Sequence, residues 1–154
     1  DIENVIVTAY NNIEGNCVIS NWLGEDVNVR CYDADDEPAD MAYLIAIIGR
    51  LPGSTTSVVG QALAADETDS SYEPLNVYNA GGGDVTASRT DVGTYSVAFD
   101  GLNLNAGANI HVDSYGLGRR CGVAAWAGNT VNVTCTNTSG TLQDSPYSIV
   151  VFQD

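Results

Sequence analysis

The densest group of metal-ligating side chains in the sequence is a short acidic segment. Five carboxylates fall within eight residues, those of Asp33, Asp35, Asp36, Glu37 and Asp40. Carboxylate oxygens at alternating positions suit Ca²⁺, so this segment is a candidate calcium site. It lacks the central glycine and the distal glutamate of an EF-hand loop, and a solvated acidic loop is the competing interpretation. We therefore expect no cofactor other than this candidate calcium ion.

The sequence contains few residues that could carry out catalysis. The single histidine, His111, occupies a polar position of an alternating strand pattern, so we expect it to be an exposed strand residue. No serine lies in a GxSxG motif, and the cysteines are better explained as disulfides. Gly81, Gly82 and Gly83 are not followed by the Gly-Lys-Ser/Thr of a phosphate loop and are interpreted as a hairpin turn. The sequence predicts a protein without enzymatic activity.

The four cysteines are spaced evenly in two pairs. Cys17 and Cys31 are 14 residues apart, and so are Cys121 and Cys135. A zinc site would need closer cysteine pairs or nearby histidines, and neither exists. The equal spacing favours the disulfides Cys17–Cys31 and Cys121–Cys135 over the other two pairings, each worth roughly 3 kcal/mol in a chain-entropy model. Disulfides imply an oxidising compartment, and Asp1 is interpreted as a mature end left by signal-peptide cleavage, so we expect a secreted or cell-surface protein.

The charge balance excludes two classes of partner. Five arginines, no lysine and twenty acidic residues give a net charge of −15 in 154 residues. Nucleic-acid backbones and anionic membranes both require clusters of basic residues, so neither is expected as a partner. A hydrophobic content of 44% is high enough to form a packed core.

An internal repeat relates the two ends of the chain. Residues 4–48 align with residues 108–152 at an offset of 104, which becomes 105 before the first cysteine. The offset superposes Cys17 on Cys121, Trp22 on Trp126, Cys31 on Cys135, Asp40 on Asp144 and Tyr43 on Tyr147. Residues 53–107 have no counterpart. We therefore divide the chain into a half repeat, 1–52, and a complete repeat, 53–154, packed as one compact unit. The complete repeat consists of an A half, 53–107, and a B half, 108–154.

The repeat weakens the calcium interpretation. The counterpart of the acidic loop is Thr136-Asn137-Thr138-Ser139-Gly140, which carries no charge. A structural ion common to the repeat would need ligands in both copies, so the acidic loop is better explained as solvated.

The motifs along the chain resemble a known repeat. The A half reads A-AD, SY-P, YN-GG, V-T-R and G-Y-V-F-GL in order, and the B half reads YG, RC-V, W, V-V-C and D, followed by Y-V-F. This order is similar to an uncharacterised tandem repeat of secreted proteins from actinobacteria and myxobacteria. The resemblance covers residues 62–152 once and residues 4–48 as a half. It implies secretion, a β-rich fold and a tandem arrangement, and it implies no catalytic residues.

Strict alternation of apolar and polar residues predicts β-strands. Residues 94–99 and 109–115 alternate, and glycine, asparagine and aspartate clusters separate such segments. Pairing 16–22 with 26–32 around Gly24 sets Cys17 opposite Cys31, Ile19 opposite Val29 and Asn21 opposite Val27, on one core-facing side. The apolar runs 43–48 and 147–152 predict strands covered on both faces. We predict an all-β fold, an antiparallel sandwich of about twelve strands, four in each half.

The half repeat is the feature that bears most on function. A lone B half exposes an apolar face and unpaired strand edges, which must be covered by the single A half or by another subunit. We therefore predict a secreted structural protein that self-associates, and a filament if the contact is head-to-tail. The alternative is an extracellular module that binds surface glycans, with Trp22 and Trp126 as stacking platforms. Asn132 and Asn137 lie in N-glycosylation sequons.

Overall fold

A computed structural model describes residues 2–10, 15–49 and 58–153, and these fold into twelve antiparallel strands with no α-helix. The predicted all-β sandwich with about twelve strands is confirmed. A single-turn 3₁₀ helix, Leu104–Ala106, is the one helical element of the described residues. The strands are β1 (Ile2–Tyr10), β2 (Asn16–Leu23), β3 (Asp26–Tyr32), β4 (Ala42–Gly49), β5 (Val58–Ala64), β6 (Leu75–Asn79), β7 (Val85–Asp91), β8 (Thr94–Phe99), β9 (Asn109–Ser114), β10 (Arg120–Ala127), β11 (Thr130–Thr136) and β12 (Tyr147–Phe152).

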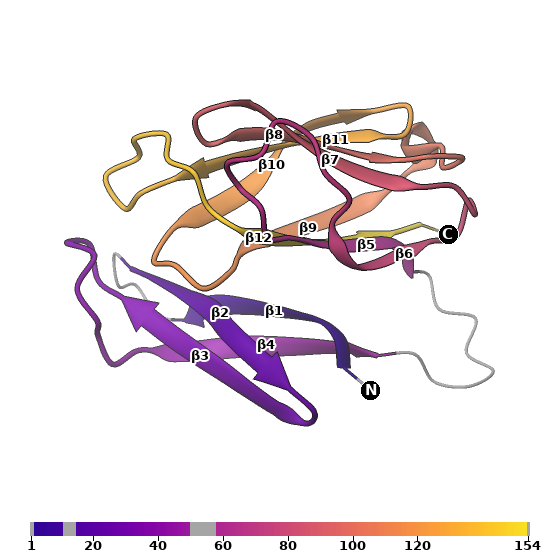
Figure 1. The fold of residues 1–154 in the computed structure, drawn as a ribbon. Coiled ribbons are helices and arrows are strands. Elements are labelled where there is room, and N and C mark those ends of the chain that lie inside the picture. The colour runs from indigo at the N-terminus through magenta and orange to yellow at the C-terminus, as the bar shows by residue number, and fades with distance from the viewer. Residues whose placement is uncertain (1, 11–14, 50–57, 154) are drawn as a thin grey trace.

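Strands β5 to β12 form a closed two-layer sandwich, here called the C-terminal sandwich. One sheet has the order β10-β11-β8-β7 and the other the order β6-β5-β12-β9. Both layers are visible in the upper part of Figure 1. The alternation of β8 turns Tyr95, Val97 and Phe99 inward, where they pack in one cluster with Ile149 and Val151 of β12. Each sheet therefore joins two strands of the A half to two strands of the B half.

Strands β1 to β4 form two separate two-stranded sheets, β1-β4 and β2-β3, here called the N-terminal half. A smaller cluster lies between them and contains the buried side chains of Val5, Val7, Cys17 and Ile19. In Figure 1 these indigo and purple strands lie beneath the sheet that contains β12 and β9. Asn4 Nδ2 donates a hydrogen bond to the carbonyl of Ile149, at 3.2 Å, so the half is bonded to the outer side of that sheet.

The two cysteine hairpins pair as predicted up to a bulge. Cys17 is bonded to Cys31, and Cys121 to Cys135, which confirms the predicted disulfides. The pairing Ile19 with Val29 is also confirmed. The expected pairing of Asn21 with Val27 is wrong, because the register shifts between Ile19 and Asn21 and sets Trp22 opposite Val27. The same shift, 104 residues later, sets Trp126 opposite Val131.

The two apolar runs have different environments. Strand β12 is buried along nearly its whole length, as expected for a strand covered on both faces. Strand β4 is exposed over most of its length, so the same prediction is wrong for residues 43–48. The reason is tertiary, because β12 lies between β9 and β5, whereas the described strands pair β4 with β1 alone.

The glycine triplet is a turn between the two sheets rather than within a hairpin. Gly81 and Gly83 link β6 of one sheet to β7 of the other. A Cβ atom at Gly81 would lie 2.7 Å from the backbone of Gly101, and one at Gly83 would lie 2.7 Å from Asp100. Only glycine allows these two chain segments to approach so closely.

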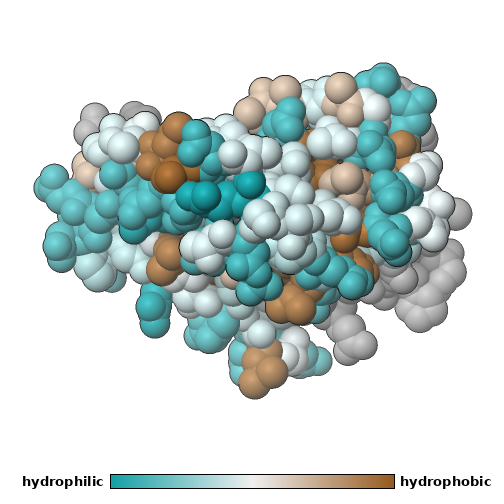
Figure 2. Space-filling model, turned by 45° about the horizontal axis from the view of Figure 1, so that its top comes forward, coloured by the Kyte–Doolittle hydropathy of each residue, from teal (hydrophilic) through white to brown (hydrophobic). Residues whose placement is uncertain are grey.

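Hydrophilic side chains are prominent on the face of the molecule that Figure 2 shows. Figure 2 shows small apolar patches separated by hydrophilic residues on the face turned to the viewer. This agrees with the twenty acidic residues of the chain, because an unpaired ionised carboxylate is costly to bury. Among the described residues, no helix has the length and apolarity needed to cross a bilayer.

Candidate functional site

The N-terminal half exposes apolar side chains whose counterparts are completely buried. Ile45 and Ile47 pair with Val7 and Val5, so all four share the inner face of their sheet. The exposed fractions are 46% for Tyr43, 41% for Ile45 and 55% for Ile47. At the offset of 104, the counterparts Tyr147, Ile149 and Val151 are each 0% exposed. On β3, the half-buried Val27 and Val29 likewise correspond to the fully buried Val131 and Val133.

Two strand edges of the N-terminal half are unpaired among the described residues. In the C-terminal sandwich, the edge of β12 is filled by β5, and the edge of β11 is filled by β8. The corresponding edges belong to β4 and β3, which pair with β1 and β2 respectively and with no other described strand. The unfilled edges and the exposed side chains lie on the same side, and together they form what we call the open face.

A groove of about 530 Å³ runs across the open face between β3 and β4. It is lined by residues of both strands and of the loop between them, including Val29, Cys31, Tyr32, Asp40 and Tyr43. Asp40 is exposed, and no described residue forms a hydrogen bond or ion pair with its carboxylate. The groove therefore has both apolar and polar walls, and its lining includes the cationic Arg30 as well as the unpaired carboxylate of Asp40.

In the C-terminal sandwich the matching carboxylate is fully engaged. Asp144 accepts two hydrogen bonds from Arg89, each 3.0 Å long. It also accepts hydrogen bonds from the backbone N–H of Gly93 and the hydroxyl of Tyr95, at 2.8 and 3.0 Å. The bonds from Arg89 are the main reason that the pKa of Asp144 is lowered. All three donors belong to the A half, so Asp144 fastens the two halves of the sandwich together. Sequence reasoning aligned Asp40 with Asp144 but did not assign this role.

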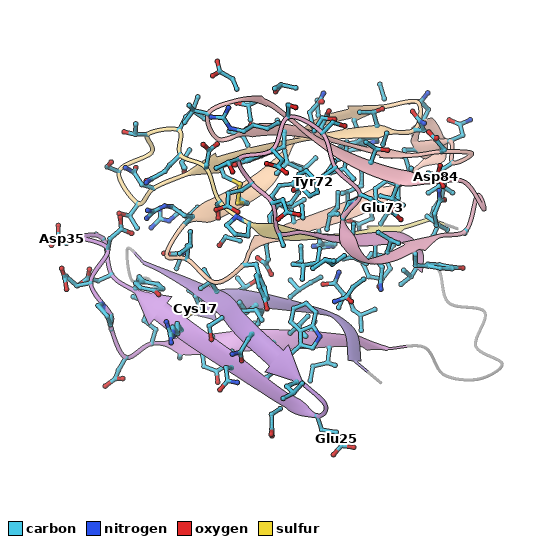
Figure 3. All side chains as sticks on the ribbon, in the orientation of Figure 1. Cys17, Glu25, Asp35, Tyr72, Glu73 and Asp84 are labelled. Atoms are coloured by element: carbon cyan, nitrogen blue, oxygen red, sulfur yellow. A yellow bond between two sulfur atoms is a disulfide. The ribbon has the colours of Figure 1, made fainter. Side chains whose placement is uncertain are left out.

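The candidate calcium loop is held by hydrogen bonds from its backbone to the side chain of Asp33. Asp33 Oδ1 accepts the N–H groups of Asp35 and Glu37, at 2.9 and 3.0 Å, and Asp36 takes a left-handed conformation with φ of 65°. Asn137 and Gly140 shape the uncharged counterpart loop in the same way, because Asn137 Oδ1 accepts the N–H of Thr141. Figure 3 shows Asp35 at the outer tip of this loop. The acidic loop therefore has the same hydrogen-bond pattern as its uncharged counterpart.

The structure does not gather these carboxylates into a metal site. Within residues 2–10, 15–49 and 58–153, no group of three or more potential ligands could hold a metal ion. Asp36 lies 3.8 Å from a guanidinium nitrogen of Arg119, which links the loop to the C-terminal sandwich. Asp40 faces the groove instead.

The remaining sequence candidates are spread over the surface. His111 is exposed on β9, where its ring lies edge-on to Phe152 at 5.9 Å between centroids. Trp22 is half-buried, with its ring 5.5 Å from that of Tyr115, whereas Trp126 on β10 is 46% exposed. The two tryptophans therefore do not form a common platform. Asn132 is exposed on β11, and Asn137 caps its own loop.

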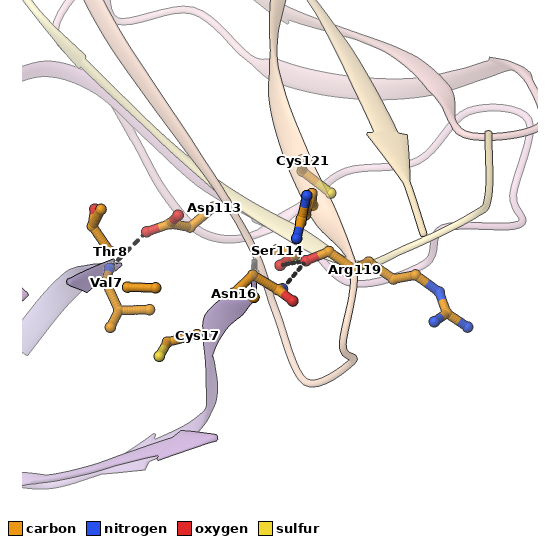
Figure 4. Close-up of a pocket in the computed structure, with 11 residues that line it drawn as sticks. Val7, Thr8, Asn16, Cys17, Asp113, Ser114, Arg119 and Cys121 are labelled. Atoms are coloured by element: carbon orange, nitrogen blue, oxygen red, sulfur yellow. Dashed lines mark hydrogen bonds between the residues drawn. The ribbon is translucent and has the colours of Figure 1, made fainter. Parts of the chain in front are cut away.

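A second cavity, of about 360 Å³, lies where the N-terminal half meets the C-terminal sandwich. Figure 4 shows Asp113 of β9 beside the backbone of β1, where its Oδ2 accepts the N–H of Val7 at 2.7 Å. Asn16 Nδ2 also donates to the carbonyl of Arg119, at 2.7 Å. Burial raises the pKa of Asp113 to about 6, and the bond from Val7 offsets only part of this effect.

We expect the stability of this junction to fall as the pH rises through the pKa of Asp113. The folded protein retains a proton on Asp113 up to about pH 6, whereas the unfolded chain loses it near pH 4. Protonation of Asp113 therefore makes its full contribution to the free energy of unfolding below pH 4. This contribution, about 2–3 kcal/mol, is lost between pH 4 and 6. Chemical denaturation between pH 4 and 8 measures it. Asp113→Asn keeps an acceptor for Val7, and its pH profile should be flatter; an unchanged profile would contradict the assignment.

These features define the protein as an antiparallel β-sandwich with two disulfides and an additional, incomplete half-sandwich. The disulfides indicate an oxidising environment. Comparison with protein-family models, with curated proteins and with solved structures found no match.

Proposed function

We propose that the protein is a secreted, non-enzymatic structural component of an extracellular assembly, joined to its neighbours by β-strand addition at the open face. The observation that carries this proposal is the contrast between Ile45 and Ile47 and their counterparts Ile149 and Val151, which are completely buried. Unpaired edges beside exposed apolar side chains are the features by which sheets acquire strands from another chain.

The position of the exposed residues supports this proposal. Soluble monomers rarely leave a sheet edge unprotected, and Tyr43, Leu44, Ile45 and Ile47 form a continuous exposed segment on β4. Self-association through this segment gives a filament where the contact is head-to-tail, because such contacts do not close.

Ile47→Asp is expected to abolish concentration-dependent association of the purified protein. A charge on β4 opposes pairing of the exposed edge, while Ile47 is 55% exposed, so the change costs the isolated fold little. Leu75→Asp on the edge strand β6 is the matched control, because Leu75 is 56% exposed. Light scattering over a range of concentrations measures the mass, and electron microscopy shows whether filaments form.

A protein that remains monomeric at every concentration, with both variants indistinguishable from it, would contradict assembly through β4. Equal loss of association in both variants would place the contact elsewhere. The glycan-binding alternative stays a prediction, and it now depends on Trp126 alone, since Trp22 packs against Tyr115.

A further inference from the structure

We propose that the open face accepts a β-hairpin of another polypeptide segment, one that carries an arginine ahead of a Tyr-x-Val-x-Phe strand. This inference rests on the proposed function and names the occupant of the face. The model for the occupant is the β7–β8 hairpin of the C-terminal sandwich, which fills the equivalent position beside β11.

The register of the incoming strand follows from that hairpin. Strand β8 pairs Tyr95 with Val133 and Val97 with Val131. Applying the offset of 104, a strand of the same type would set its tyrosine opposite Val29 and its valine opposite Val27. The hairpins of β2-β3 and β10-β11 share the same disulfide position and the same bulge, so they present these residues in the same order.

The apolar contacts of the hairpin also have matching residues on the open face. In the C-terminal sandwich the ring of Tyr95 lies 5.1 Å from that of Tyr147, between centroids. The counterpart of Tyr147 is Tyr43, which is 46% exposed and lines the groove. A tyrosine arriving beside Val29 would therefore cover Tyr43.

The unpaired carboxylate of Asp40 favours an occupant that carries an arginine. Asp144 binds Arg89 of the hairpin at 3.0 Å, whereas its counterpart Asp40 lies unpaired at the rim of the groove. A hairpin of the β7–β8 type would bring an arginine to Asp40, as Arg89 is brought to Asp144.

The hairpin of the same molecule is not available for this role. Its Arg89 is bonded to Asp144, and its strand β8 is paired with β11. Moving the hairpin to the N-terminal half would leave β11 without its partner strand, because the chain contains one A half and two B halves. The donor therefore belongs to a segment other than residues 85–99 of the same molecule.

The binding experiment uses the hairpin of this chain as the probe. A synthetic peptide of residues 85–100, in a linear form and in a form cyclised between its ends, is titrated into the full chain and followed by fluorescence anisotropy. The cyclic form removes the cost of ordering an isolated hairpin. We expect saturable binding that the Arg89→Asp peptide weakens at least tenfold, as expected for loss of a bidentate ion pair.

Charge reversal tests the partner of the arginine. Asp40→Arg in the full chain should weaken binding of the native peptide at least tenfold, and the Arg89→Asp peptide should restore it. Asp35→Arg is the matched control, since it makes the same charge change at the outer tip of the same loop, and it should leave binding within about twofold.

Several results would overturn the inference. No saturable binding of the cyclic peptide would exclude the hairpin as occupant, and binding indifferent to Asp40 would exclude the arginine contact. Self-association that the peptide fails to displace would assign the face to a second copy. These outcomes leave the Ile47→Asp result untouched, so failure of the hairpin is distinguishable from failure of strand addition itself.

Discussion

Ile149→Ala is expected to lower the free energy of unfolding by about 2–5 kcal/mol, whereas Ile45→Ala should lower it by about 1 kcal/mol or less. The two isoleucines hold the same position in the two segments, yet Ile149 is 0% exposed and Ile45 is 41% exposed. Removing methyl groups from a closed core leaves a cavity, while removing them from an open face mainly changes its contact with solvent.

Urea denaturation followed by tyrosine and tryptophan fluorescence measures both losses, and Ile149→Val provides a milder substitution at the same site. Comparable losses at the two positions would mean that Ile45 is covered in solution. If the hairpin peptide is bound, the cost of Ile45→Ala should rise, because the added strand converts the open face into a closed core.

Removing the Cys17–Cys31 disulfide is expected to unfold the N-terminal half while the C-terminal sandwich stays folded. Each disulfide closes a sequence separation of 14 residues, which corresponds to about 3 kcal/mol in the unfolded chain. Among the described residues of the N-terminal half, the apolar cluster contains only four buried side chains, those of Val5, Val7, Cys17 and Ile19, and Val18 is buried outside this cluster. A core of this size contributes too little stability to keep the half folded once the stabilisation by the disulfide is lost.

Hydrogen exchange of the Cys17→Ala/Cys31→Ala double variant measures this local unfolding, with loss of protection expected in β1 to β4. The Cys121→Ala/Cys135→Ala variant is the matched control. Its sandwich has fifteen buried core residues, so we expect a global loss of about 3 kcal/mol without unfolding. If β1 to β4 of the first variant stay protected from hydrogen exchange, the low stability assigned to the N-terminal half is contradicted.

The hairpin register up to the disulfide could be predicted from the sequence, because cysteines spaced equally in two segments fix which residues face each other. The bulge after Ile19 could not. It turns Trp22 toward Tyr115, which lies in the connection between β9 and β10 and is distant in sequence. Burial of Asp113 was equally hidden, since it results from packing against β1, whose Val7 is 106 residues away in the sequence.

The exposure of β4 shows most clearly that the pattern of a short segment does not determine its burial. Residues 43–48 are as apolar as residues 147–152, and nothing within either run distinguishes them. The difference comes from β5 and β8. These strands pair with β12 and β11 of the C-terminal sandwich, and no described strand pairs with β4 and β3 in the same way. The open face was therefore foreseeable from counting halves, but the groove and the unpaired Asp40 required the folded arrangement.

The acidic loop beside the open face has a consequence for solubility. Residues 1–53 contain ten acidic residues and two arginines, and the carboxylate of Asp40 lines the groove between β3 and β4. Charged residues beside an exposed edge act as gatekeepers, because each strand added without a compensating cation brings the carboxylates of two molecules together. We therefore expect association of identical molecules through the open face to strengthen as the salt concentration rises, because salt screens the repulsion between their carboxylates.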